Sequence, residues 1–116
     1  MRQSSYTIMG QQKDIRYLAG MLYQNINIKV AKTVVTSKLV KGVLPAGTIV
    51  NNVGAPSNDA NAFGVVFNDV DFNDSKGTEI LSVCIFGFLS KARIKEYTNE
   101  EPTAEAIKSL NMIKFL

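Results

Sequence analysis

The chain has 116 residues, enough for one domain that buries roughly two thirds of its unfolded surface around a single core. It contains no histidine and a single cysteine, Cys84, which excludes Ser-His-Asp and Cys-His catalysis, zinc sites that need these residues and any internal disulfide. The net charge of +3 is carried by dispersed lysines without interleaved aromatic residues, so we expect no nucleic-acid groove.

The first 25 residues are predicted to form an N-terminal arm or helix. Ile15, Leu18, Ala19 and Leu22 have the spacing of one helical face, and Asp14 is a suitable N-cap, so we expect a helix over residues 13–24. The segment has two possible roles: it packs on its own domain, or it is an arm that docks on a partner. No apolar stretch here resembles a signal peptide, and the longest apolar run, at residues 83–89, is too short to cross a membrane.

Residues 25–94 are predicted to be strands. "NINIKV" alternates strictly between polar and apolar residues, as a half-buried strand does, and Pro45 with Gly47 marks a turn before the strand "TIVNNV". "FGVVFNDV" and "EILSVCIFGFLSKARI" are expected to be the next two strands. The second is apolar on both faces between Ile80 and Leu89, so it should run through the middle of the domain.

The end of the chain is predicted to be a short helix followed by an apolar segment. Thr103 is a suitable N-cap for a helix over residues 103–110, and "MIKFL" is apolar enough to return to the sheet or to pack on a neighbouring subunit. The expected fold class is mainly β (β-rich α+β), a small barrel or sandwich with an N-terminal arm or helix, a short C-terminal helix and no parallel βαβ units.

The acidic stretch "NDVDFNDSKGTEI" raises the question of a cation site or a catalytic carboxylate pair. Asp69, Asp71 and Asn73 fit the first, third and fifth positions of a calcium loop, but the sixth is Asp74 where glycine is needed, and the twelfth is Ile80 where glutamate is needed. A weak cation site at Asp69, Asp71 and Asp74 stays open beside a solvated turn. We expect no catalytic residue, no metal and no cofactor, because nothing else in the sequence assists these carboxylates.

The order of motifs from residue 39 onward resembles that of phage head decoration and head fiber proteins. "LVKGVLPAGTIVNNVG" is followed by "NAFGVVFNDVDFNDSKGTEILSVCIFGFLSKARI" and then by "TAEAIKSLNMIKFL". The resemblance implies a decoration-like β-rich domain over residues 26–116, without enzymatic activity, on the outer capsid surface of a virion. Its implied partners are the major capsid protein and further copies of itself, commonly as a homotrimer, with no membrane and no nucleic acid.

Two alternatives remain beside this expectation: a structural protein of the tail, neck or baseplate, or a small β-barrel that binds single-stranded nucleic acid. For the arm, we expect Tyr6, Ile8, Arg16 and Tyr17 to contact the capsid or a neighbouring subunit. Ile113 and Phe115 are candidates for a subunit interface, the alternative being that they pack on their own domain.

Overall fold

The computed structural model describes residues 14–17, 22–73 and 77–116. Its elements, in chain order, are β1 (Gln24–Ala31), α1 (Lys32–Val35), the 3-10 helix η1 (Thr36–Lys38), β2 (Val43–Leu44), β3 (Ile49–Val50), β4 (Gly64–Val66), β5 (Val70–Asp71), β6 (Thr78–Leu89), α2 (Lys91–Thr98), α3 (Ala104–Ser109) and β7 (Ile113–Phe115). Among the described residues, no helix is long and apolar enough to span a bilayer.

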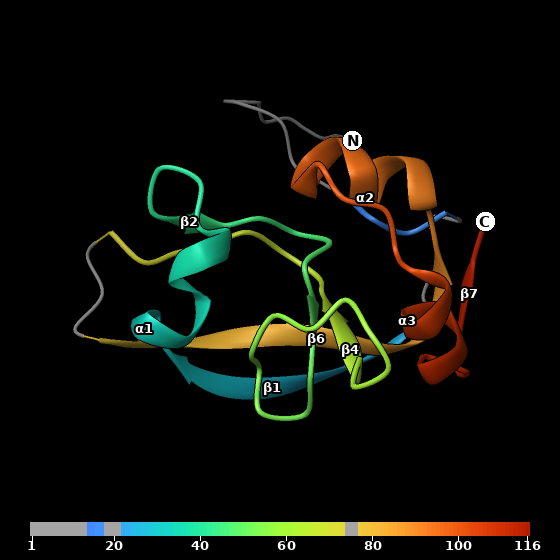
Figure 1. Ribbon diagram of the computed structural model, residues 1–116, viewed down its shortest axis with the longest axis horizontal. Coiled ribbons are helices and arrows are strands. Elements are labelled where there is room, and N and C mark those ends of the chain that lie inside the picture. Colours follow the sequence, from blue (N-terminus) through green and yellow to red (C-terminus); the bar gives the residue numbers. More distant parts are fainter. Residues whose placement is uncertain (1–13, 18–21, 74–76) are drawn as a thin grey trace, which may run out of the picture.

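The strands form a five-stranded sheet built on β6 and a separate two-stranded sheet (Figure 1). In the larger sheet the order is β1-β6-β4-β3 with antiparallel pairing, and β7 pairs with β6 in parallel at Gly87–Leu89. The smaller sheet is the antiparallel pair of β2 and β5. The fold is therefore a small β-rich α+β fold, which confirms the predicted class and the central place of β6.

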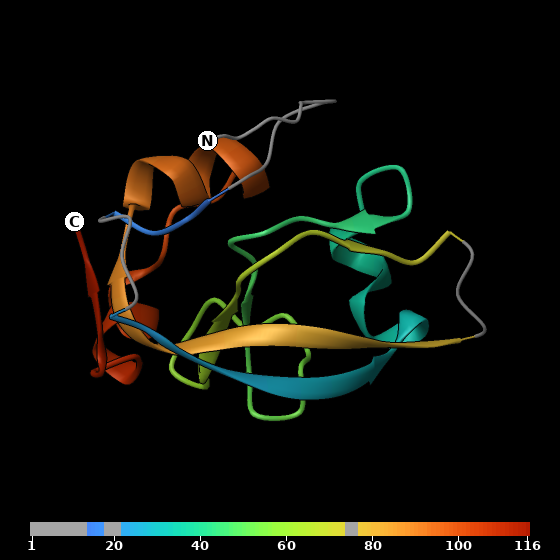
Figure 2. The same cartoon turned by 180° about the vertical axis from the view of Figure 1, so that it is seen from behind.

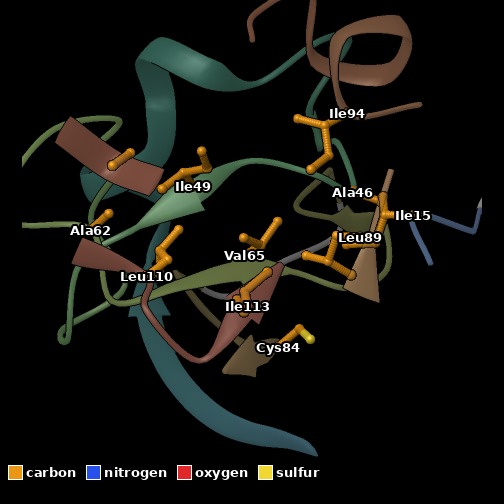
Figure 3. Packing of buried hydrophobic residues seen from close by; sticks show 11 residues of the cluster. Ile15, Ala46, Ile49, Ala62, Val65, Cys84, Leu89, Ile94, Leu110 and Ile113 are labelled. Carbon is orange, nitrogen blue, oxygen red and sulfur yellow. The ribbon is translucent and has the colours of Figure 1, made fainter. Parts of the chain in front are cut away.

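Two hydrophobic cores lie on the two faces of this sheet, because β6 is apolar on both. Val83 and Cys84 are consecutive and both fully buried, and neighbouring side chains of a strand point to opposite faces. Val83 belongs to a core that includes Val35 of α1 and Leu44 of β2. Cys84 belongs to the other core, shown in Figure 3, where Ile94 of α2 and Leu110 after α3 pack toward the sheet.

The C-terminal helix is where the sequence predicts it. The Thr103 hydroxyl accepts a hydrogen bond from the Ala106 backbone N–H at 3.1 Å, and α3 follows directly. After the turn at Asn111 and Met112, β7 returns to the sheet, which was one of the two expected outcomes for "MIKFL". The parallel pairing of β7 with β6 through α2 and α3 also shows that the expected absence of a parallel crossover was wrong.

The strand predicted to continue through "SKARI" ends instead at Leu89. Ser90 caps a helix there, since its hydroxyl accepts from the Arg93 N–H at 3.3 Å, and α2 ends at Asn99, which adopts the left-handed conformation at φ 62°. Ile94 is the buried residue of this helix. With so little apolar periodicity, the caps are the main sequence signal for α2.

The helix expected over residues 13–24 is wrong for the part that the structure describes. The Ser90 N–H donates to the Ile15 carbonyl at 2.8 Å and the Tyr17 N–H donates to the Phe88 carbonyl at 2.9 Å, so this segment pairs with the end of β6. Gln24 already belongs to β1, and Leu22 is 64% exposed although the helical pattern required it to be buried. Residues 1–13 and 18–21 lie outside the described residues.

Two glycines of the larger sheet lie where strands approach closely or change register. A Cβ on Gly64 would overlap the Cγ1 atom of Val83, so this glycine allows β4 to lie close to β6. Gly87 has a φ of 143° and lies against Tyr23, next to a register shift between β1 and β6 at Gln24 and Asn25.

Candidate interaction surfaces

The N-terminal segment contacts the domain through Arg16, whose guanidinium is paired with Asp14 and lies over two stacked rings. The Asp14 carboxylate accepts hydrogen bonds from the Arg16 side chain at Nε (2.9 Å) and at Nη2 (2.8 Å). The Arg16 guanidinium lies 5.3 Å from the ring centroid of Tyr23 and 5.9 Å from that of Phe67, and these rings stack at 4.8 Å. Arg16 is therefore engaged within its own chain.

Helix α2 also contacts this N-terminal segment, and the two lie next to each other in Figure 2. Arg93 donates from Nη1 to the Arg16 carbonyl at 2.7 Å and to the Asp14 carbonyl at 3.3 Å, and the Tyr97 hydroxyl accepts from the Asp14 N–H at 3.4 Å. The hydrogen bonds from the Arg16 side chain are the main reason that the pKa of Asp14 lies below its ordinary value. We call these contacts of Asp14, Arg16, Arg93 and Tyr97 the clasp. Its role is structural, because the side chains of these residues bind one another or backbone groups of the same chain.

The six predicted contact residues fall into different environments. Tyr6 and Ile8 lie outside the described residues. Arg16 is half-buried in the clasp, whereas Tyr17 is 52% exposed and free to meet a partner. Ile113 is buried in the core beneath α2 and α3 and Phe115 packs against that core, so both follow the alternative of packing on their own domain.

In the described structure, the carboxylates of the acidic stretch accept hydrogen bonds from backbone N–H groups of loops. The Asp69 carboxylate accepts from the Ala46 N–H at 2.8 Å, which holds the turn before β3, and the Asp71 carboxylate accepts from the Asn73 N–H at 2.8 Å. Asp74 lies outside the described residues. Among those that are described, no three His, Cys, Asp or Glu side chains come close enough to hold a metal ion.

The lone thiol is buried rather than presented to solvent. Cys84 has no exposed surface, and its Sγ donates to the Phe86 carbonyl at 3.3 Å. Burial raises the pKa of the Cys84 thiol above its ordinary value, which lowers the fraction of reactive thiolate. The residue acts as a small apolar side chain of the core.

An apolar groove runs between β6 and the segment that links α3 to β7. One part, of ≈ 370 Å³, is lined by Phe63, Ile85, Leu110 and Met112 among others. A second part, a hollow of ≈ 250 Å³ beside Phe86 and Phe88, shares Asn111 and Met112 with the first. Phe63 is 40% exposed and Met112 is 60% exposed, so this apolar groove offers large side chains to solvent.

Sequence analysis did not single out the apolar groove, since Phe63 and Met112 are far apart in the chain and line one hollow only through the pairing of β4, β6 and β7. The sequence feature that could have indicated this groove is the apolar character of "CIFGFL" on both faces of its strand. In comparisons with known proteins, the chain matches no protein-family model, no curated protein and no solved structure.

Proposed function

We propose that this chain is a non-enzymatic structural protein of a virion, which attaches to the outside of a phage capsid as a decoration or head fiber protein and stabilises the shell. The structural observation in its favour is the apolar groove, where Phe63 and Met112 both line one hollow and expose large apolar side chains. Clustered exposure of this kind is typical of a surface that binds another macromolecule. The identity of the partner, the major capsid protein, comes from the resemblance in motif order.

The lining of the groove combines large apolar side chains with polar ones. Phe63, Phe88 and Met112 belong to the aromatic and methionine types that are enriched at the centre of interfaces, and Ser109, Asn111 and Lys114 also line the groove. Full burial of one such large apolar side chain contributes about 1.5–3 kcal/mol. Two of them account for a substantial part of the affinity for one capsid site, and an oligomer of the chain that binds several sites of one shell at once gains avidity.

Attachment is tested by co-sedimentation of the purified chain with phage heads that lack it. We expect saturable binding, which the double variant Phe63→Ser/Met112→Ser weakens by about tenfold or more. The matched control is Val53→Ser, because Val53 is 64% exposed but does not line the groove. A wild-type chain that stays in the supernatant at every concentration would contradict attachment to the capsid. Equal binding by the double variant and the wild type would show that the apolar groove is not the surface that attaches.

A place in the tail, neck or baseplate of the virion is the alternative that uses the same groove. Cryo-EM of the intact particle separates the two, because density for the chain falls either on the shell or on the tail. We further propose that the chain associates with itself, with the homotrimer that the resemblance implies, and that it needs no cofactor.

A further inference from the structure

Within residues 14–17, 22–73 and 77–116, strand β1 has a backbone partner on one side only. It pairs with β6 along its whole length, from Gln24 opposite Phe86 to Ala31 opposite Thr78, and the described residues supply no strand on its other side. This open edge is eight residues long and carries a single charged side chain, Lys29. Long regular edges with few charges readily pair with another strand.

The hydrogen bonds of the sheet identify the residues that face the open edge. The Phe67 N–H donates to the Ser82 carbonyl at 2.8 Å, so the backbone groups of Ser82 point toward β4. Asn27 lies opposite Ser82 on the other side, in a pair without mutual hydrogen bonds, and therefore points its own N–H and C=O away from β6. The backbone alternates, so the outward residues are Asn25, Asn27 and Lys29, and the inward residues are Ile26, Ile28 and Val30.

We infer that β1 pairs in antiparallel fashion with β1 of a second copy of this chain, about a two-fold axis at Asn27. In this register Asn27 forms a hydrogen-bonded pair with Asn27 of the second copy, and Asn25 pairs with Lys29 of that copy. Ile26 then lies beside Ile28 of the second copy on the apolar face. Each outward residue gains a backbone partner, and the interface is self-complementary as a two-fold contact requires.

The side chains of β1 favour this register over those with the axis at Ile28 or Lys29. Asn25 Nδ2 donates to the Ser82 hydroxyl at 3.1 Å, whereas its Oδ1 is the buried side-chain polar atom of the described residues that has no hydrogen-bond partner. With the axis at Asn27, Lys29 of the second copy lies beside Asn25, so the one charged side chain of the strand has a polar neighbour across the interface. An axis at Ile28 would place Ala31 there, and an axis at Lys29 would set two ammonium groups against each other.

This inference does not rest on the proposed function, since it uses only the strand edge and not the apolar groove. A two-fold contact gives a dimer of the free chain. If the chain also forms trimers through another surface, the same contact joins one trimer to the next.

Disulfide trapping tests the register directly. The Cα atoms of a hydrogen-bonded antiparallel pair are about 5.5 Å apart, within disulfide range, so Asn27→Cys should form a covalent dimer under mild oxidation. Asn25→Cys alone should not, because its two copies would lie about 13 Å apart, whereas Asn25→Cys/Lys29→Cys should. The native Cys84 is buried and does not compete.

Association without a crosslink provides the second measurement. Light scattering of the wild-type chain should show a mass that rises with concentration, and Asn27→Pro should abolish this rise because it removes an outward N–H without touching the ladder to β6. Asn27→Cys that crosslinks no faster than the exposed control Thr33→Cys, or self-association unchanged in Asn27→Pro, would overturn the inference. Loss of capsid binding in Asn27→Pro, with self-association intact, would overturn it too, since the edge would then accept a capsid strand.

Discussion

The two strands at the ends of the order β1-β6-β4-β3 differ in how their outer edges are covered. At β3 the chain covers its own edge: Val50 forms a bridge to Pro56, and the Ser57 N–H donates to the Ile49 carbonyl at 2.8 Å. At β1, four times as long as β3, the described residues leave the outer edge bare. Folded chains commonly protect their edges against association, so a bare edge opposite a covered one indicates a surface kept for assembly.

The loop that covers β3 also rests on β1, which makes Gly54→Ala the most damaging change. Gly54 has a φ of 87°, and a Cβ there would overlap the Cγ1 atom of Val30. We expect a loss of about 3 kcal/mol in the free energy of unfolding, from backbone strain and overpacking together. Gly77→Ala is the control, because its φ is 114° but nothing lies within 4 Å of the added Cβ. Denaturant unfolding should show the control losing about 1 kcal/mol, and equal losses would mean that the loop does not press on β1.

Proline substitutions at two adjacent positions of β1 test separately its hydrogen bonds to β6 and its open edge. Ile28→Pro removes an inward N–H and leaves a carbonyl of β6 without its donor, so it should cost about 2 kcal/mol, whereas Asn27→Pro removes an outward N–H and should cost less than about 1 kcal/mol. Thermal unfolding at low protein concentration measures both. The two variants losing the same stability would contradict the assignment of outward and inward residues.

The cover of the β3 edge depends on the side chain of Asn51. Its Oδ1 accepts from the Val53 N–H and from the Ala55 N–H, both at 3.0 Å. Asn51→Ala should cost about 1 kcal/mol and should speed amide exchange at Ser57, because the loop loses the bonds that shape it. The exposed neighbour Asn52 serves as the control, with Asn52→Ala expected to leave both quantities unchanged.

The N-terminal segment pairs with the end of β6 beyond β1. Removal of the ion pair between Asp14 and Arg16 in this segment is expected to have the smallest effect on the free energy of unfolding. The pKa of Asp14 is lowered in the folded chain, so its stabilisation is present above the ordinary pKa and is lost as the pH falls through the lowered one. Asp14→Asn should cost about 0.5 kcal/mol near neutral pH, since the pair is partly exposed. The difference between variant and wild type should vanish in strong acid, and a constant difference down to that pH would contradict this assignment.

Much of this sheet could be predicted from local pattern. The strict alternation of "NINIKV" identified β1, the doubly apolar run identified β6 as central, and the Thr103 cap located α3. The helix predicted over residues 13–24 was wrong because Ile15 and Leu22 share a helical spacing, whereas backbone pairing with β6 decides the conformation of residues 14–17. Helix α2 was missed because Ile94 is its single buried residue, so capping by Ser90 outweighs periodicity.

The surfaces were harder to predict than the strands. The apolar groove joins Phe63 to Met112 through tertiary pairing, which no local pattern encodes. The open edge of β1 depends on which strands become neighbours, and the parallel return of β7 was not foreseen. Local pattern therefore predicts which residues are strands, while the order of those strands decides which edge is left for a partner.

Amide hydrogen exchange along β1 tests most directly whether this edge is open in the single chain and closed by a second copy. In dilute solution the outward residues Asn25, Asn27 and Lys29 should exchange fast and the inward residues Ile26, Ile28 and Val30 slowly. As protein concentration rises, exchange at the outward residues should slow. Uniform protection along β1 in dilute solution would contradict an open edge, and outward residues that stay fast at every concentration would contradict its pairing with a second copy.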